Sequence, residues 1–361
     1  MPHANVIPIR FAATEYSSKS KPGVQDRLGR PMLDLRISVT DRCNLRCSYC
    51  MPGEIFDKNH AYLPRSELLS LEEIARIAST FAALGVRKIR LTGGEPLLRR
   101  GIVQLVEKLA MLKTPDGAPV EIAMTTNGVL LAERAQALKD AGLSRITVSL
   151  DALDQAIFST MSGSDVNVAG VLAGIVAAQR AGLSPKVNMV VKRGVNDGEI
   201  IGMAEHFRSS GIVLRFIEYM DAGSSNGWLM DDVYSAAEIV ALISARHPLL
   251  PVDPNFAGEV ASRYAYADGS GEIGLISSVT KVFCHDCTRI RLSTDGRLYT
   301  CLFAEQMGAD LKRIVRNGGS DLQLGGAIAE CWKNRSDRYS QIRNELQGLP
   351  RNKIEMSYIG G

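Results

Sequence analysis

Three cysteines lie within one short stretch of the chain, at Cys43, Cys47 and Cys50. Thiolates this close together typically share a metal centre. Four cysteines would saturate a structural zinc ion or a four-iron cluster, whereas three leave one coordination position open, as in catalytic metal sites. The stretch therefore predicts a metal centre with a vacant position. A zinc knuckle with a distant fourth ligand is the alternative.

A second group of three cysteines follows much later in the chain, at Cys284, Cys287 and Cys301, separated by two and then thirteen residues. His285 lies between the first two, so a zinc ion held by three cysteines and a histidine is one interpretation. A histidine inside a Cys-x-x-Cys turn is, however, poorly placed to bind the same metal as both cysteines. The seventh cysteine, Cys331, falls in an expected helix and is interpreted as structural.

Composition narrows the class of protein. The chain has 361 residues, 45% of them hydrophobic, which suits one large α/β domain with an appendage or two ordinary domains. No apolar run approaches the roughly 18 residues of a membrane span, and the N-terminus lacks a hydrophobic signal core. The net charge is only +3 and arises in the first 32 residues. We expect a cytoplasmic protein with no nucleic-acid or membrane partner, whose clustered cysteines bind metal in a reducing compartment.

From Leu33 onward one unit repeats: a short β-branched run, a loop, and an amphipathic helix that ends in glycine. Gly85, Gly142 and Gly182 stand at three of these joints and are interpreted as helix C-caps. Strands are expected near residues 33–39, 86–92, 120–126, 144–150, 184–191 and 212–219. Alternating strands and helices predict a parallel sheet, and six units are too few for a closed eight-stranded barrel. We therefore expect an α/β fold with an incomplete (β/α)6 barrel resembling a TIM barrel.

Polar or glycine-rich residues follow the first four expected strands. They are the first cysteine loop and residues 92–96, 125–128 and 149–151. In parallel β/α architectures chemistry gathers beyond the C-terminal ends of the strands, so these loops should share one active face. Gly93 and Gly94 would let the backbone approach a ligand closely there.

The repeat is lost after Met220, which suggests three parts. We expect a flexible N-terminal arm at residues 1–32, the partial barrel at 33–257, and a C-terminal part at 258–361. A helix is expected near residues 235–246, before prolines interrupt the chain. The C-terminal part holds the second cysteine group, expected helices near 308–317 and 321–333, and a tail that ends in Gly360 and Gly361.

Two familiar nucleotide-binding motifs do not apply. Residues 269–274 fit Gly-x-Gly-x-x-Gly, but a β-like run follows where a dinucleotide-binding helix would be needed. The chain contains no Gly-Lys pair and hence no P-loop. A phosphate-bearing ligand would then need several cations, preferably Arg, whose planar fork binds phosphate through two hydrogen bonds.

The motifs together resemble the radical S-adenosylmethionine superfamily. The resemblance rests on Cys-x-x-x-Cys-x-x-Cys after the first strand and Gly-Gly-Glu-Pro after the second. It implies that the first cysteine group holds a 4Fe–4S cluster whose fourth iron binds the amino and carboxylate groups of S-adenosylmethionine. One electron from the cluster would cleave a carbon–sulfur bond and yield a 5′-deoxyadenosyl radical that abstracts hydrogen. The residues implied to line the S-adenosylmethionine site are Tyr49, Gly94, Ser149 and Met220.

Over residues 33–361 the sequence is similar to the GTP 3′,8-cyclases of molybdenum cofactor biosynthesis. The shared features are Cys-x-x-Cys-x-Arg-x-Arg, a third cysteine thirteen residues on, and the terminal Gly-Gly. The resemblance implies that GTP is the substrate, that the C-terminal extension carries a second 4Fe–4S cluster on Cys284, Cys287 and Cys301 that meets the guanine, and that Gly360 and Gly361 reach into the active site. The residues implied to bind GTP are Arg36, Arg90, Thr125, Lys186, Arg289, Ile290 and Arg291.

The same resemblance implies an external electron donor, a homodimer, and a downstream cyclic pyranopterin monophosphate synthase. Two rival interpretations stay open. One is a radical enzyme that modifies a peptide or tetrapyrrole and carries an auxiliary cluster, and such enzymes typically hold more auxiliary cysteines. The other is a non-catalytic electron-transfer or zinc-stabilised binding protein, which would not explain two cysteine groups that both lack a fourth ligand.

Overall fold

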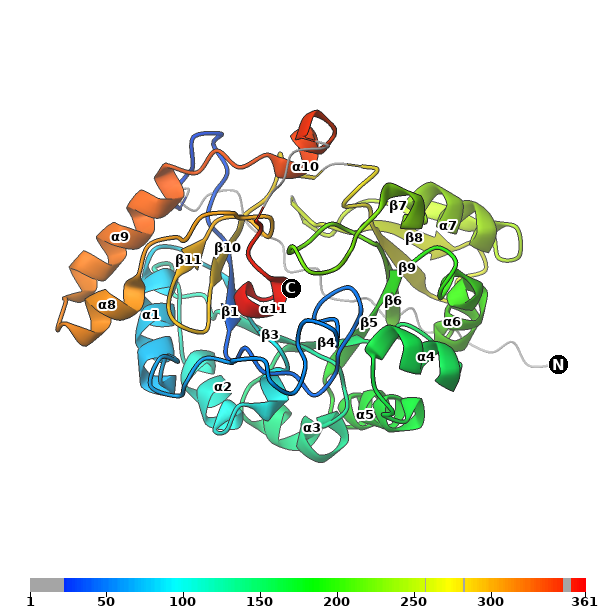
Figure 1. Cartoon of the computed structure of the whole chain (residues 1–361), viewed down its shortest axis with the longest axis horizontal. Helices are drawn as coiled ribbons and strands as arrows, with labels where there is room; N and C mark the ends of the chain where they lie inside the picture. The colour runs from blue at the N-terminus through cyan, green and yellow to red at the C-terminus, as the bar shows by residue number, and fades with distance from the viewer. Residues whose placement is uncertain (1–22, 257, 282, 347–351) are drawn as a thin grey trace, which may run out of the picture.

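The computed structural model describes residues 23–256, 258–281, 283–346 and 352–361 (Figure 1). Its strands form one eleven-stranded sheet in the order β11-β10-β1-β2-β3-β4-β5-β6-β9-β8-β7. The strands are β1 (Asp34–Ser38), β2 (Lys88–Thr92), β3 (Glu121–Thr126), β4 (Arg145–Ser149), β5 (Ser184–Val191), β6 (Val213–Glu218), β7 (Leu249–Val252), β8 (Ser262–Tyr266), β9 (Glu272–Ile276), β10 (Arg289–Leu292) and β11 (Leu298–Tyr299).

The six strands expected from the sequence are β1 to β6, and they pair as parallel neighbours. Side chains alternate between the two faces of a strand. In β5, Val187 and Met189 belong to the apolar core, whereas Lys186 and Asn188 point to the other face. Each strand thus gives one face to the helices and one to the interior of the curved sheet. The expected α/β fold with six repeating units is confirmed.

Two further parallel strands come from the C-terminal part of the chain. β9 pairs with β6, and β10 pairs with β1 on the opposite side of the sheet. The edges are antiparallel, with β11 beside β10 at one end and β8 and β7 beyond β9 at the other. The sheet therefore stays open. It contains strands both from the expected barrel and from the expected C-terminal part of the chain. Sequence pattern did not reveal this because β9 and β10 lie far along the chain from their partners β6 and β1.

Helices cover the outer face of the curved sheet (Figure 1). The α-helices of the described chain are α1 (Leu71–Ala83), α2 (Ile102–Ala110), α3 (Leu131–Asp140), α4 (Gln155–Ser162), α5 (Val168–Arg180), α6 (Ile200–Phe207), α7 (Ala236–Ser244), α8 (Leu311–Arg316), α9 (Asp321–Lys333), α10 (Tyr339–Ile342) and α11 (Met356–Ile359). Helix α11 does not belong to the outer layer. The three helices expected late in the chain correspond to α7, α8 and α9. The predicted glycine C-caps are confirmed, since Gly85, Gly142 and Gly182 have positive φ angles just after α1, α3 and α5.

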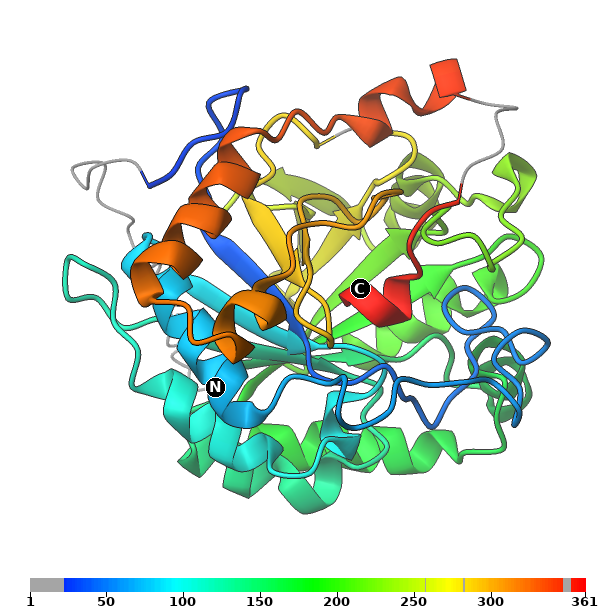
Figure 2. The same ribbon diagram turned by 60° about the vertical axis from the view of Figure 1, so that its left-hand side comes forward.

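Both ends of the described chain pack against the body of the protein. Helix α11 lies inside the ring of strands, against β1 (Figure 1 and Figure 2). At the other end the structure describes residues 23–32 of the expected arm, and there Asp26, Arg30 and Met32 are buried. The indole N–H of Trp332 donates to the carbonyl of Arg30 at 3.0 Å, which ties this segment to α9. Residues 1–22 lie outside the described residues.

Among the residues that the structure describes, no helix combines the length and the apolar character needed to span a membrane.

Candidate active site at the strand ends

The first cysteine group lies in the loop that follows β1. The N–H of Cys50 donates to the carbonyl of Cys47 at 2.9 Å and closes a turn. Cys43 Sγ accepts hydrogen bonds from the N–H of Leu45 at 3.4 Å and from Asn127 Nδ2 at 3.8 Å. Burial raises the pKa of Cys43 to about 11 and the pKa values of Cys47 and Cys50 well above the ordinary thiol value. Buried thiols of this kind become thiolates when a metal replaces the proton.

Arg46, inside the same loop, holds its shape. Its guanidinium donates to the carbonyl oxygen of Cys43 at 2.9 Å and to that of Phe56 at 2.6 Å. A third hydrogen bond reaches the hydroxyl of Tyr62 at 3.0 Å. One side chain thus links both ends of the loop that carries the cysteines. The sequence analysis missed this role because the three partners become neighbours only when the loop folds.

Gly94 and Glu95 join the cysteine loop to the ends of β2 and β3. A Cβ atom on Gly94 would lie 2.2 Å from the carbonyl oxygen of Arg42, so the glycine permits close contact with the loop backbone. The Glu95 carboxylate is buried and accepts hydrogen bonds from Thr126 Oγ1 at 2.8 Å and from the N–H of Asn127 at 2.7 Å. Burial raises the pKa of Glu95 to about 7 despite these bonds. Gly94 and Glu95 therefore help to hold the first cysteine loop against the ends of β2 and β3.

The second cysteine group meets two guanidinium groups. Cys287 Sγ accepts hydrogen bonds from Arg335 Nη2 at 3.1 Å and from Arg289 Nη2 at 3.4 Å. Burial opposes ionisation of this thiol, but the two arginines outweigh burial and lower its pKa to about 6. Cys301 is close enough for its charge and that of Cys287 to affect one another, and burial raises its pKa to about 12. The N–H of Cys287 also donates to the carbonyl of Cys284 at 3.3 Å.

The cysteine groups do not have the geometry of a site for a single metal ion. Within the described residues, no three His, Cys, Asp or Glu side chains converge tightly enough to hold one ion. An iron–sulfur cluster does not need this convergence, because each cysteine binds a different iron. Two groups of three half-buried thiols, with hydrogen-bond donors directed at Cys43 and Cys287, fit such clusters.

A row of three arginines crosses the inner face of the sheet. Arg36 on β1 is the direct register partner of Arg291 on β10 and of Arg90 on β2. Burial lowers the pKa of Arg36 well below its usual value, and the neighbouring charge of Arg291 lowers it further. Arg36 Nε is buried and lacks a hydrogen-bond partner within the described residues. Like charges in direct register destabilise a sheet, so this row is suited to a bound anion.

The next row along the same strands has balanced charges. Asp34 is the register partner of both Arg289 and Lys88, and Lys88 is the partner of Glu121. Lys88 Nζ lies 2.9 Å from Glu121 Oε1, and Arg145 Nε lies 3.4 Å from the same oxygen. Because opposite charges alternate here, the excess positive charge belongs to the row that contains Arg36.

Further cations lie on the same inner face, on strands farther along the sheet from β10. Arg90 Nη1 donates to Thr125 Oγ1 at 3.0 Å and to Thr147 Oγ1 at 3.3 Å. Burial, then the charge of Arg215, lowers the pKa of Lys186 to about 7. Arg215 on β6 was missed by the sequence analysis, although its position between Leu214 and Phe216 could have placed it on the inner face. The interior thus collects cations from β1, β2, β5, β6 and β10.

Of the residues expected to line the S-adenosylmethionine site, Tyr49 and Gly94 belong to or contact the first cysteine loop, whereas Ser149 ends β4 and Met220 follows β6. The hydroxyl of Tyr49 donates to Asp151 Oδ2 at 2.8 Å, which ties the loop to the end of β4. Ser149 is the register partner of Asn188, whose Oδ1 is buried and lacks a partner within the described residues. Met220 packs at the end of β6 against a small apolar cluster that includes Phe303. Asn188 was not predicted as a site residue, although it alternates along β5 with the core residue Met189 and so belongs on the inner face.

The C-terminal tail enters the same region. The carbonyl oxygen of Gly360 accepts a hydrogen bond from Arg291 Nη1. Gly360 has φ of 78°, and a Cβ atom there would lie 2.3 Å from Thr92 Cγ2 at the end of β2. Gly361 follows directly, next to Met356. The structure therefore brings the terminal glycines next to β2, which leads to Gly94, and to β10, which lies between Cys287 and Cys301.

Two predicted residues do not present side chains to this region. Ile290 is fully buried in the apolar core between the sheet and the helices, so only its backbone is available to a ligand. Cys331 packs against the same core, as expected for a structural residue.

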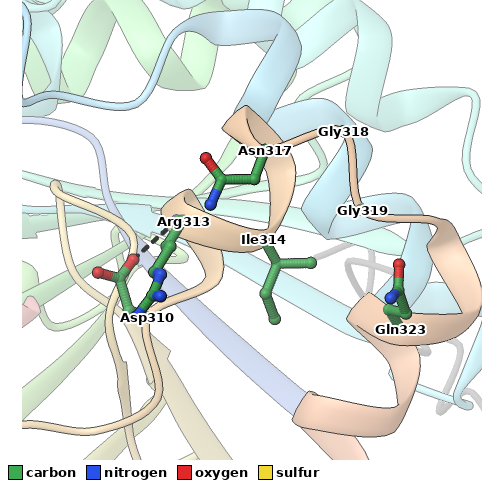
Figure 3. A pocket seen from close by; sticks show the side chains of 7 residues that line it. All are labelled: Asp310, Arg313, Ile314, Asn317, Gly318, Gly319 and Gln323. Atoms are coloured by element: carbon green, nitrogen blue, oxygen red, sulfur yellow. Dashed lines mark hydrogen bonds between the residues drawn. The ribbon is translucent and has the colours of Figure 1, made fainter.

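A hollow of about 730 Å³ lies at the turn between α8 and α9 (Figure 3). Its lining includes Asp310, Arg313 and Gln323 and none of the predicted site residues. Asp310 Oδ1 accepts a hydrogen bond from the N–H of Arg313 at 2.9 Å, as the N-cap of α8. The polar groups here serve the helix ends.

Comparisons with known proteins cover almost the whole chain. Residues 37–207 match the family model "Radical SAM superfamily", and residues 212–341 match "Molybdenum Cofactor Synthesis C". A protein of Acidothermus cellulolyticus named "GTP 3′,8-cyclase" is 53% identical, and the match covers 94% of this chain and 99% of that protein. A protein of the same name from Staphylococcus haemolyticus is 46% identical, with the same coverage. Among solved structures, Streptococcus suis SuiB has a similar fold, with a TM-score of 0.59 at 14% identity over 88% of this chain and 69% of that one.

Proposed function

Since the chain belongs to the GTP 3′,8-cyclase family of the radical S-adenosylmethionine superfamily, we propose that it converts GTP to (8S)-3′,8-cyclo-7,8-dihydroguanosine 5′-triphosphate in the first step of molybdenum cofactor biosynthesis. The structural observation that best supports this function is the row formed by Arg291, Arg36 and Arg90. It places three cations side by side on the inner face of the sheet, with no carboxylate in register between them.

The first cysteine group is the proposed radical-generating site. Cys43, Cys47 and Cys50 would hold a 4Fe–4S cluster, and S-adenosylmethionine bound to it supplies the radical that takes hydrogen from the substrate. Support comes from the thiols themselves, which are half-buried and come from one loop. Three cysteines would leave one iron of a four-iron cluster without a protein ligand. Arg46 and Gly94 keep that loop in place against the ends of the strands.

The rim for S-adenosylmethionine would be built from four strand-end segments. Tyr49, Gly94, Ser149 and Met220 are proposed to line it, as the family resemblance implies. Asn188 adds a buried amide oxygen beside Ser149 that lacks a partner within the described residues, and a ribose hydroxyl or an amino group could donate to it.

The inner cations are the proposed GTP site. A triphosphate bound at Arg36, Arg90 and Arg291 would neutralise charges that otherwise repel one another across the sheet. Lys186 and Arg289 would add further charge, and Thr125 is positioned by its hydrogen bond from Arg90. For Ile290 we propose a contact through the backbone alone, because its side chain is in the core.

The second cysteine group is proposed to hold another 4Fe–4S cluster with an open iron for the guanine base. The arrangement that supports it is the set of half-buried Cys284, Cys287 and Cys301 next to the strand that carries Arg289 and Arg291. The tail would contribute Gly360 and Gly361 on the other side of the substrate, with Gly360 held by Arg291.

Other parts of the proposal rest on the family alone. They are a homodimer, an external electron donor, and a downstream cyclic pyranopterin monophosphate synthase that uses the product. The proposed cytoplasmic location rests on the sequence composition and the clustered cysteines. The division into an arm at residues 1–32, a barrel at 33–257 and a cluster domain at 258–361 also stays a proposal, and strands of the last two parts share one sheet.

The experiment is anaerobic reconstitution of the clusters followed by reaction with S-adenosylmethionine, dithionite and GTP. We expect 5′-deoxyadenosine and the cyclised guanine nucleotide in equal amounts. Absence of 5′-deoxyadenosine would overturn the radical function. Formation of 5′-deoxyadenosine without a cyclised nucleotide would instead favour a radical enzyme acting on a different substrate. In Cys43→Ser, cleavage of S-adenosylmethionine should be lost.

A further inference from the structure

Arg335 contacts the second cysteine group from outside the predicted GTP site. Its Nη2 donates to Cys287 Sγ at 3.1 Å and its Nη1 donates to the carbonyl oxygen of Cys287 at 2.7 Å. Only 1% of the side chain is exposed. Arg335 follows α9 in the sequence, and both of these hydrogen bonds go to Cys287. It is therefore a buried cation directed at a sulfur rather than at the inner face of the sheet.

The N-terminal segment holds this arginine in place. Asp26, whose side chain is fully buried, accepts hydrogen bonds from Arg335 Nη1 at 3.3 Å and from Arg30 Nε at 2.6 Å. Arg30 Nη1 in turn donates to the carbonyl of Cys284 at 2.8 Å. The ring of Trp332 lies 4.5 Å from the Arg335 guanidinium carbon. Arg335 is thus fixed by three different segments of the chain, which an ordinary surface ion pair does not require.

The charges around Arg335 only partly cancel. Asp26 is shared between Arg335 and Arg30, and Asp337 Oδ2 lies 3.5 Å from Arg335 Nε. Arg289 adds another cation at the same sulfur. Cys287 therefore lies next to two buried guanidinium groups. The first cysteine group differs, because the hydrogen bonds to Cys43 Sγ come from uncharged amide groups.

We propose that Arg335, locked by Asp26, is a positioning residue that raises the reduction potential of the cluster at the second cysteine group. The inference rests on the proposed function, since it requires a cluster on Cys284, Cys287 and Cys301. Reduction adds negative charge to the cluster and its thiolates. A charged hydrogen-bond donor stabilises that charge, and hydrogen bonds to the sulfurs are one of the factors that set iron–sulfur potentials.

A consequence is that the two clusters differ in potential. The second cluster, with guanidinium donors at Cys287, is the easier of the two to reduce. The first cluster, where the hydrogen bonds to Cys43 Sγ from the described residues come from neutral amides, keeps the lower potential that cleavage of a sulfonium requires. The described N-terminal residues then matter for the redox properties of a site that is more than two hundred and fifty positions away in the sequence, as the 254-residue separation of Arg30 and Cys284 illustrates.

The test uses the full-length chain with Cys43→Ser, Cys47→Ser and Cys50→Ser, so that only the second cluster contributes to the spectrum. Its potential is measured by redox titration followed by electron paramagnetic resonance. In this background Arg335→Gln should favour the oxidised state about tenfold, a shift of about 59 mV to lower potential for one electron. Arg335→Lys, which keeps the charge, should recover part of the shift.

The matched control is Arg30→Gln. Arg30 shares Asp26 and donates to a cysteine carbonyl, but within the described residues its hydrogen bonds do not reach a sulfur. It should shift the potential by less than half as much as Arg335→Gln. Equal shifts in the two variants, or no shift in Arg335→Gln with its iron retained, would overturn the proposal. If the background protein binds no iron at all, the proposed second cluster itself is wrong. Iron content thus separates failure of the function from failure of this inference.

Discussion

Arg291 donates a hydrogen bond to the carbonyl oxygen of Gly360, and so the last turn of the chain meets the arginine row on the inner face of the sheet. The contact joins β10, which lies between Cys287 and Cys301 in the sequence, to a tail that also touches Thr92 at the end of β2. One residue of the tail is therefore in contact with strands on either side of β1. The order of the tail is expected to depend on what anchors it upstream.

Lys353 provides that anchor. Its Nζ lies 2.6 Å from Asp221 Oδ2 and 2.8 Å from the carbonyl oxygen of Asp221, in the loop that follows Met220. Only 9% of the Lys353 side chain and 11% of the Asp221 side chain are exposed. Lys353→Met should loosen the tail locally by about 2 kcal/mol, in the range for hydrogen bonds to charged groups, because Asp221 keeps its ion pair with Arg343. Hydrogen exchange of the amides in residues 352–361 measures this, and Lys333→Met at the exposed end of α9 serves as control. Unchanged exchange in the tail would contradict the anchor.

Arg36→Met should separate stability from binding. Arg36 lies between two register partners of the same charge and has a buried Nε without a partner in the described structure, so its removal relieves repulsion in the empty protein. The free energy of unfolding without nucleotide should rise by about 1 kcal/mol. Affinity for GTP should fall by about 2 kcal/mol, roughly 30-fold. Denaturant unfolding and calorimetric titration measure the two quantities. Arg180→Met, at the exposed end of α5, should leave both nearly unchanged, and a loss of stability in Arg36→Met would speak against the anion site.

Lys186 should make GTP binding depend on pH. Burial and the charges of Arg215 and Arg145 lower its pKa to about 7, below the 10.5 of an ordinary lysine. Between these values the unfolded chain carries a proton at this position that the folded protein lacks, so this group makes folding more favourable as pH rises and less favourable as pH falls toward 7. A bound triphosphate favours the protonated form. Binding at pH 8 should therefore take up a proton, and affinity should fall as pH rises above 7.

Calorimetry in two buffers with different ionisation enthalpies measures the proton uptake by Lys186. Lys186→Arg is the matched variant, because arginine keeps its charge across this range. It should bind GTP with little proton uptake from pH 7 to 9. If the variant took up as many protons as the unmodified chain, another group would have to be responsible.

Gly94→Ala should disturb the first cysteine loop. The added Cβ would lie 2.2 Å from the carbonyl oxygen and 2.5 Å from the carbonyl carbon of Arg42, so the backbone itself has to move. Overlap of this kind costs about 3 kcal/mol. Retention of iron after reconstitution and the denaturation midpoint should both fall. Gly170→Ala in α5 adds a methyl group to open space and should preserve both. Full iron retention by Gly94→Ala would show that the close contact is not required.

Much of the barrel and its site followed from local sequence pattern. The strands β1 to β6 were predictable because side chains alternate along each run and glycines end the helices between them. Alternation within a strand also placed Arg36, Arg90 and Lys186 on the face opposite Leu35, Leu91 and Val187. The cysteine groups were visible as spacing alone, and the family resemblance gave them their roles.

Other features depended on pairing between distant segments. The attachment of β9 and β10 to opposite sides of the sheet set the register of Arg291 against Arg36, and no local pattern contains that register. Asp26 in the N-terminal segment and Arg335 after α9 became partners only because the chain ends pack together beside Cys287.

The sequence by itself determined which residues could bind metal or phosphate and which glycines could end helices, since these properties depend on side-chain chemistry and short spacing. Only the tertiary structure decided which cations stand unneutralised in one row and which are balanced by Asp34 and Glu121. The reason is physical. Periodicity fixes the face of a strand on which a side chain lies. Which side chains lie beside it on neighbouring strands depends on burial and hydrogen bonding across the whole chain.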